Sequence, residues 1–423
     1  VVILCVWLFS VVAGHAQLSL DECRRLAREN YPEIRQYDLV HQTEQYNLSN
    51  AARAWIPQLA FSAQATWQTD APNFPKELTG MLAQQGLEIP GLRKDQYKVA
   101  LELNQTIWDG GKSVADKRIA RAEAAEQKTM TDVDLYELEG RVDDLYFGIL
   151  LLDERIAQTN LTLNLLRSNL EKVRALQRNG VAMQSDADVL EAELLSVGQQ
   201  LIQFESSCDS YRRMLGIFIG QKVGDRKLLR PSAVQPLSGE SARPELAMFA
   251  AKIDRLMAQE KMVKSSSMPR LGFFAQGYYG YPGLDYMQSM MNSDWSWNAM
   301  LGVKLSWNFG AYYTQKNNLN KLRTSRQQVE VQRDVFLFNM NLQAAQENGD
   351  IARLRKAIAD DDRIVALRRS VREAAESKLR NGIIDTHDLL SKITDESTAS
   401  MARSMREIEL LKAIYEYKHT INR

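Results

Sequence analysis

Residues 135–173 read LYELEGRVDDLYFGILLLDERIAQTNLTLNLLRSNLEKV, and apolar side chains recur along them in alternating steps of three and four residues. A seam sustained in this way indicates a long helix that packs knobs into holes, as in a coiled coil. Its members are Leu135, Leu138, Val142, Leu145, Ile149, Leu152, Ile156, Thr159, Leu163, Leu166, Leu170 and Val173. The seam resumes through Leu190, Leu194, Val197, Leu201, Phe204, Cys208, Tyr211, Leu215 and Phe218. We therefore predict a helical hairpin with helices over residues 111–179 and 185–218.

Prolines are absent from two long spans of the chain. None lies between Pro90 and Pro231, and none follows Pro282. Because proline breaks helices, both spans favour very long helices. The second span accommodates a second hairpin, with predicted helices over residues 312–380 and 385–421.

The sequence repeats itself. Four blocks recur in the same order, and they pair residues 30–34 with 242–246, 57–64 with 269–276, 101–110 with 301–310, and 178–181 with 380–383. Ordered blocks with small changes of offset indicate an internal duplication. We assign the first repeat to residues 17–219 and the second to 242–423. Residues 220–241, which are rich in Gly and Pro, form the predicted linker.

Four segments alternate apolar and polar side chains with the period of a β-strand, over residues 57–69, 96–108, 269–281 and 295–308. Each is long enough for a tilted strand to cross a bilayer, which takes about 9–11 residues. Six of the seven tryptophans, including Trp55, lie in or beside the strands. Five of them are the predicted aromatic girdle of a membrane barrel, namely Trp67, Trp108, Trp295, Trp297 and Trp307. A soluble β-sandwich, which also alternates, is the other interpretation of this pattern.

Four strands cannot close a barrel, and an open sheet edge is not tolerated in lipid. Several copies of the chain must therefore contribute strands. Two copies would give eight strands around a filled interior, and three would give twelve around a wider lumen. The wider lumen of a trimer is suited to a conduit.

Residues 1–16 are predicted to be a signal peptide, because an apolar run ends in Gly14-His15-Ala16 and is too short to span a membrane. A buried first helix is the alternative. No later apolar stretch reaches about 18 residues, so we expect strands to make any membrane crossing. Ser19 and Glu22 form a capping box, which predicts a helix from there to about Ala54.

The composition excludes several classes of protein. Lys plus Arg and Asp plus Glu both number 53, which argues against nucleic-acid binding. Four His and three Cys are scattered, and no nucleophile with an activating base or phosphate-binding loop is present. We expect no enzyme activity, metal or cofactor. Cys23 and Cys208 are either buried thiols or, in an oxidising compartment, a disulfide.

The two hairpins reverse at Gly180 and Gly382, where a left-handed helix end is expected. Ser185 with Asp188, and Asp385 with Asp388, are the predicted N-terminal caps of the returning helices.

Several of these motifs resemble TolC-family outer membrane efflux proteins. Residues 18–22, followed by Leu26, Ala27, Asn30, Pro32 and Glu33, resemble the start of that family. Residues 108–111 (Trp-Asp-Gly-Gly) resemble its strand-to-helix turn, and residues 308–311 are a degenerate copy. The turns at residues 179–181 and 381–383 resemble its periplasmic tips. The resemblance extends over essentially all of the chain after residue 16.

The resemblance implies a mostly α fold with a membrane portion: a homotrimer with a 12-stranded β-barrel in the bacterial outer membrane and a 12-helix barrel across the periplasm. It implies passive conduction in a tripartite efflux or type I secretion system. A periplasmic adaptor, linked to an inner-membrane pump, would dock on the tips at Arg178, Asn179, Gly180, Val181, Arg380, Asn381, Gly382 and Ile383.

The resemblance also places Asp186, Asp385 and Asp388 at a pore constriction, for which helix capping is the simpler alternative. Two departures bear on this gate, Leu379 in place of an aromatic residue and Ser391 in place of an acidic one. Two rival classes are a periplasmic coiled-coil adaptor and a structural protein without a pore. The sequence does not identify the cargo.

Overall fold

The computed structural model describes residues 17–86, 89–180, 182–233 and 241–422. The predicted signal peptide and Val181 lie outside the described residues. The chain divides into a helical unit, residues 1–37, 128–249 and 331–423, and a sheet unit, residues 38–127 and 250–330. The fold is mostly helical with a four-stranded sheet, as the sequence predicts.

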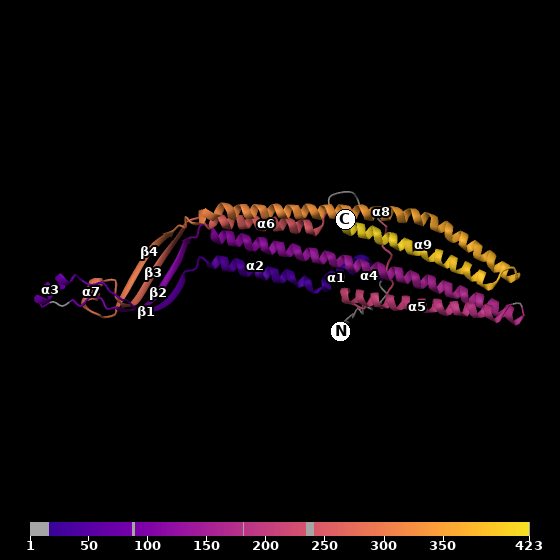
Figure 1. Cartoon of the computed structure of the whole chain (residues 1–423), viewed down its shortest axis with the longest axis horizontal. Helices are drawn as coiled ribbons and strands as arrows, with labels where there is room; N and C mark the ends of the chain where they lie inside the picture. Colours follow the sequence, from indigo (N-terminus) through magenta and orange to yellow (C-terminus); the bar gives the residue numbers. More distant parts are fainter. Residues whose placement is uncertain (1–16, 87–88, 181, 234–240, 423) are drawn as a thin grey trace, which may run out of the picture. The chain divides into compact units, whose positions relative to one another are not determined.

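The sheet contains β1 (Gln58–Trp67), β2 (Asp95–Trp108), β3 (Arg270–Tyr281) and β4 (Ser296–Ser306), antiparallel neighbours in chain order (Figure 1). β1, β3 and β4 lie within the segments predicted from alternation, and β2 begins one residue before its predicted segment. The pairing register aligns the alternating faces, because Phe61 lies opposite Leu101, Leu101 opposite Gly277, and Gly277 opposite Ala299. Residues paired across strands point to the same side of a sheet, so the sheet has one apolar face and one polar face.

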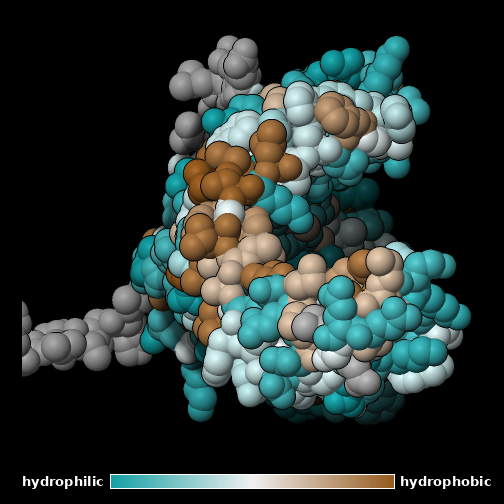
Figure 2. Space-filling view, turned by 90° about the vertical axis from the view of Figure 1, so that its left-hand side faces the viewer, coloured by the Kyte–Doolittle hydropathy of each residue, from teal (hydrophilic) through white to brown (hydrophobic). Residues whose placement is uncertain are grey.

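The sheet unit also contains most of α2 (Gln36–Arg53) and of α6 (Pro244–Ser265), and the first turns of α4 (Lys112–Arg178) and α8 (Ala311–Arg380). Its strands lie between these helices at one end and α3 (Lys76–Gln84) and α7 (Tyr286–Met291) at the other (Figure 1). Figure 2 looks onto the end with α3 and α7, where hydrophobic side chains gather beside hydrophilic ones. Met81 and Met287 are among the exposed apolar residues of these two helices.

The helical unit contains α1 (Leu20–Asn30), α5 (Gln184–Ile219), α9 (Thr386–Ile421) and the greater part of α4 and α8. The prediction of one helix from Ser19 to Ala54 is wrong. The chain leaves the helix at Tyr31, whose φ of −68° and ψ of 129° are extended, and then forms a 3-10 turn, η1 (Pro32–Arg35). The cause is Pro32, because a proline disfavours the helical conformation of the residue before it.

The seam of α4 forms the core of the helical unit. Leu135, Val142 and Ile149 are fully buried in a cluster with residues of α1, α5 and α9. A second cluster surrounds Leu166 and Leu190 and includes Ile393 of α9. Both clusters are built from side chains spaced three or four residues apart, as the heptad pattern requires.

Candidate functional site

The two hairpins reverse at the same end of the helical unit, where residues of α4, α5, α8 and α9 share one apolar cluster (Figure 1). Gly180 has a φ of +73°, and its amide donates to the Gln177 carbonyl at 2.9 Å. Gly382 has a φ of +68°, and its amide donates to the Leu379 carbonyl at 2.9 Å. Glycine adopts this left-handed conformation without steric cost. Both predicted reversals therefore have the predicted conformation.

Three acidic residues near the tips have different roles in the structure. The Asp186 carboxylate accepts a hydrogen bond from the Met183 amide at 2.8 Å, so it closes the start of α5. The Asp385 carboxylate caps α9 by accepting from the Asp388 amide at 2.8 Å. Asp388 is exposed, and its carboxylate has no hydrogen-bond or ion-pair partner in the part of the chain that is described. Of these three carboxylates, that of Asp388 is the one with both oxygens unengaged among the described residues.

The predicted cap at Ser185 is wrong. Met183 is the N-cap residue of α5, and Ser185 lies within the first turn. A methionine side chain cannot accept the amide hydrogen bonds as a serine can, so the carboxylate three residues further on closes the turn from the other direction.

Ion pairs hold the helices together next to the tips. Lys172 of α4 contacts Glu376 of α8 at 3.2 Å, and Arg174 of α4 contacts Glu191 of α5 at 2.8 Å. Burial tends to raise the pKa of Glu376, but hydrogen bonds from Lys172 and Arg372 outweigh it and lower the pKa. Glu376 therefore stays ionised between two cations.

The strand-to-helix turn at the start of α4 depends on Asp109 and Gly110. The Asp109 carboxylate accepts from the Gly111 amide at 2.9 Å and the Ser113 amide at 2.6 Å. Burial tends to raise the pKa of Asp109, but these donors hold it below its usual value. A Cβ at Gly110 would lie 2.7 Å from the Met268 Cβ, and its φ is +69°. The turn therefore requires glycine there.

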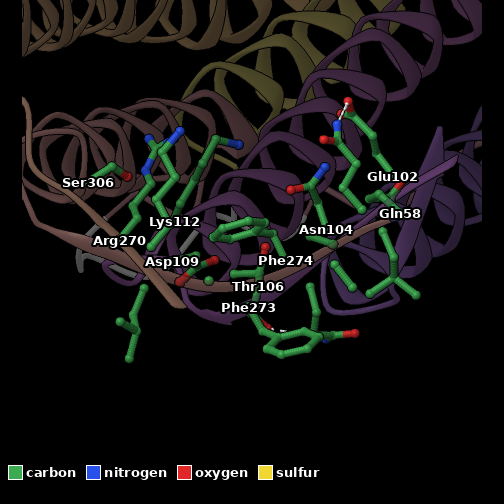
Figure 3. Close-up of a pocket in the computed structure, with 18 of the residues that line it drawn as sticks. Gln58, Glu102, Asn104, Thr106, Asp109, Lys112, Arg270, Phe273, Phe274 and Ser306 are labelled. Atoms are coloured by element: carbon green, nitrogen blue, oxygen red, sulfur yellow. Dashed lines mark hydrogen bonds between the residues drawn. The ribbon is translucent and has the colours of Figure 1, made fainter. Parts of the chain in front are cut away.

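The polar face of the sheet carries a chain of side-chain hydrogen bonds. Lys98 donates to the Gln276 side-chain oxygen at 3.1 Å, and the Gln276 amide group donates to Glu102. Next to them is a pocket of about 580 Å³ on the same face (Figure 3). Arg270 and Lys304 line this pocket, and sequence reasoning did not single them out. The alternation of β3 and β4 was the available signal, because it places both residues on the polar face.

The five predicted girdle tryptophans fall at the two ends of the sheet. Trp295 stacks on Tyr97 with ring centroids 5.7 Å apart, and Trp297 lies 5.0 Å from Tyr279, both near the end with α3 and α7. Trp67 ends β1 near the same end and is exposed. At the opposite end of the sheet, next to the starts of α4 and α8, Trp108 ends β2 and Trp307 follows β4.

Among the described residues there is neither a metal centre nor a reactive thiol. No group of three or more His, Cys, Asp or Glu that could hold a metal ion occurs among the described residues. Cys23 and Cys208 are free thiols buried in the core, not a disulfide. Burial raises the pKa of Cys23 to about 12. In the described part of the chain, no helix has the length and apolarity needed to cross a membrane.

Comparison with known proteins gives one family and a set of solved structures. Residues 24–220 match the family described as "Outer membrane efflux protein", and no curated protein matches the chain. The outer membrane protein VceC from Vibrio cholerae is 14% identical, with 95% of each chain covered and a TM-score of 0.68. The outer-membrane channel OprN is 14% identical, with 95% of this chain and 89% of that chain covered and a TM-score of 0.69. The open-state MtrE outer membrane channel of Neisseria gonorrhoeae is 14% identical, with 95% and 88% covered and a TM-score of 0.65.

The solved structures establish the fold, and the family match adds a sequence relationship over the first half of the chain. Residues 24–220 of the chain match the outer membrane efflux protein family, and the fold of the chain is that of solved outer membrane channels.

Proposed function

We propose that three copies of this chain form a passive exit duct through the bacterial outer membrane. The observation that carries the proposal is an apolar seam on α8 that this chain leaves uncovered. Val335, Phe338 and Leu342 follow the three-four spacing of a coiled coil, yet they are 53%, 70% and 63% exposed. Exposed apolar stripes of this spacing mark a surface that packs against another helix. We assign that helix to a neighbouring copy.

The sheet supports the same conclusion. Among the described strands, β1 and β4 each have one hydrogen-bonded neighbour, so both edges of the sheet are open. Open edges are not tolerated in lipid, and three copies would close twelve strands around a lumen. The exposed apolar face, with Phe61 and Leu301, would contact lipid, and the polar face would line the lumen. The two groups of tryptophans would then lie at the two membrane surfaces.

The helical part would form the periplasmic portion of the duct, a barrel of twelve helices. We further propose that the two repeats, residues 17–219 and 242–423, arose by duplication and supply two hairpins per copy. A periplasmic adaptor would dock on residues 178–181 and 380–383 and connect the duct to an inner-membrane pump. Asp388 would line the constriction at the tips, where its free carboxylates would favour cations.

Size-exclusion chromatography with light scattering, on membrane-extracted protein in detergent, tests the proposal. We expect a protein mass of three mature chains and ion conductance in planar bilayers. A protein that washes off membranes without detergent as a monomer would contradict the duct and would favour a helical protein without a pore.

The role of Asp388 has its own test. Asp388→Asn should reduce the preference for cations over anions, measured as a reversal potential in a salt gradient. Asp385→Asn is the matched control, because the Asp385 side chain caps α9. An unchanged reversal potential in Asp388→Asn would exclude Asp388 from the constriction.

A further inference from the structure

We propose that the pocket on the polar face of the sheet binds organic anions that have an apolar body, through Arg270 and Lys304. This inference rests on the proposed function, because it names a class of molecule that the wall of the duct would hold during passage. All the residues that line the pocket belong to the sheet unit.

The strand register brings the two cations together. Arg270 of β3 lies opposite Ser306 of β4, and Lys304 lies opposite Gly272, two positions further along. Side chains two positions apart on neighbouring strands share a face and lie within reach of the same ligand. Lys112 approaches the same part of the pocket from the start of α4, and Figure 3 shows it beside Arg270.

The acidic groups of the pocket are already occupied. Asp116 pairs with Lys112 at 2.7 Å. The Asp109 carboxylate holds the helix start, and Glu102 accepts from Gln276.

Arg270 and Lys304, by contrast, are exposed and have no hydrogen bond or ion pair among the residues that the structure describes. Arg270 and Lys304 are therefore the unpaired cationic side chains of the pocket, and both can form charge-assisted hydrogen bonds to an anion.

The pocket also offers an apolar surface beside these cations. Phe274 and Met300 lie on the polar face and line the pocket. Gly302 lies opposite Phe274, and a Cβ there would be 2.9 Å from the ring, so the glycine leaves room for the ring to lie over β4. An aromatic ring next to an arginine and a lysine favours a ligand with a flat apolar body and one anionic group.

Calorimetric titration of the full-length protein in a non-ionic detergent with naphthalene-2-sulfonate tests the site. We expect saturable binding to the wild type and binding weakened about tenfold or more in the double variant Arg270→Gln, Lys304→Gln, because charge-assisted hydrogen bonds are lost. Both residues are on the surface, so the variant should keep its circular dichroism spectrum.

Two controls make the result specific. Lys98→Gln removes a cation of the same face that does not line the pocket and should leave binding unchanged. The neutral analogue 2-naphthol reports partition into the detergent and should not distinguish the wild type from the double variant. No saturable sulfonate binding, or equal binding by the double variant, would overturn the site.

The same samples separate this inference from the proposed function. A trimer that conducts ions but does not bind the sulfonate would retain the duct and reject the site. A monomer that binds the sulfonate with the expected dependence on Arg270 and Lys304 would retain the site and reject the duct.

Discussion

Two helices of this chain carry apolar residues with the same three-four spacing and bury them differently. Leu135, Leu138 and Val142 of α4 have the same three-four spacing as Val335, Phe338 and Leu342 of α8, which lie 200 residues later. On α4 these positions are buried in the main core, against residues of α1, α5 and α9. On α8 they are exposed. The comparison teaches that a heptad pattern predicts a packing surface but does not say which chain covers it.

The largest expected effect comes from placing a charge on both seams. Val142→Asp should prevent the helical unit from folding, because an isolated carboxylate in an apolar core is not tolerated. Leu342→Asp should fold but remain a monomer in detergent, since its surface is exposed within one chain. Circular dichroism measures whether each variant folds, and light scattering measures its oligomeric state. Normal trimers of Leu342→Asp would show that this part of α8 is not an interface.

The next effect concerns a buried ion pair next to the α4 seam. Asp143 accepts from the Arg24 side chain, with 2.7 Å between Nε and Oδ1, and is largely buried. Asp143→Ala should destabilise the fold by about 3 kcal/mol, because it removes the buried carboxylate that accepts two hydrogen bonds from the Arg24 guanidinium. Gln343→Ala, 200 residues later and next to Leu342 of α8, should cost less than about 0.5 kcal/mol, because Gln343 is exposed. Thermal unfolding, monitored by circular dichroism, measures the stability of the two variants. Equal losses of stability in the two variants would contradict the proposed difference in burial between α4 and α8.

A smaller effect depends on pH. His419 of α9 stacks on Tyr136 of α4 with ring centroids 4.2 Å apart, and burial together with Arg243 and Arg24 lowers the pKa of His419 to about 4. The unfolded chain takes up this proton below about pH 6.5, whereas the folded chain takes it up only near pH 4. Stability should therefore fall as the pH decreases from about 6.5 to 4.

His419→Gln should remove this part of the pH dependence of the melting temperature. His387→Gln is the control, because His387 is exposed near the second tip. A pH profile unchanged in His419→Gln would show that other groups cause the loss of stability.

The smallest effect is expected where the two hairpins are alike. Gly180→Ala and Gly382→Ala should each destabilise the protein by about 1 kcal/mol, because both glycines have positive φ. Gly349→Ala, within α8 and with open space around it, should be neutral or stabilise by up to about 1 kcal/mol. Melting temperatures compare the three variants. A loss at only one tip would show that the turns differ in strain.

Much of the fold could be predicted from the sequence, because its signals are local. The three-four spacing predicts the long helices, the absence of proline predicts their length, and alternation predicts four strands and their faces. The errors are local too, where one residue overrides a longer pattern. Pro32 divides the first helix, and Met183 takes the cap position that Ser185 was expected to fill.

The candidate site was harder to predict. The resemblance to the family offers Asp186, Asp385 and Asp388 as candidates for the constriction and favours Asp388. Only the structure shows that backbone amides engage the carboxylates of Asp186 and Asp385 and not that of Asp388. Arg270 and Lys304 are distant in sequence from Asp109 and Glu102, and only strand pairing shows which charges lack a partner.

The sequence by itself therefore determined which elements form and which face of each is apolar, since spacing along the chain sets these properties. Only the tertiary structure decided which apolar faces are covered, which acids hold helix ends and which cations are left over. Those outcomes depend on contacts between residues far apart in sequence, and burial and pairing exist only once the chain has folded.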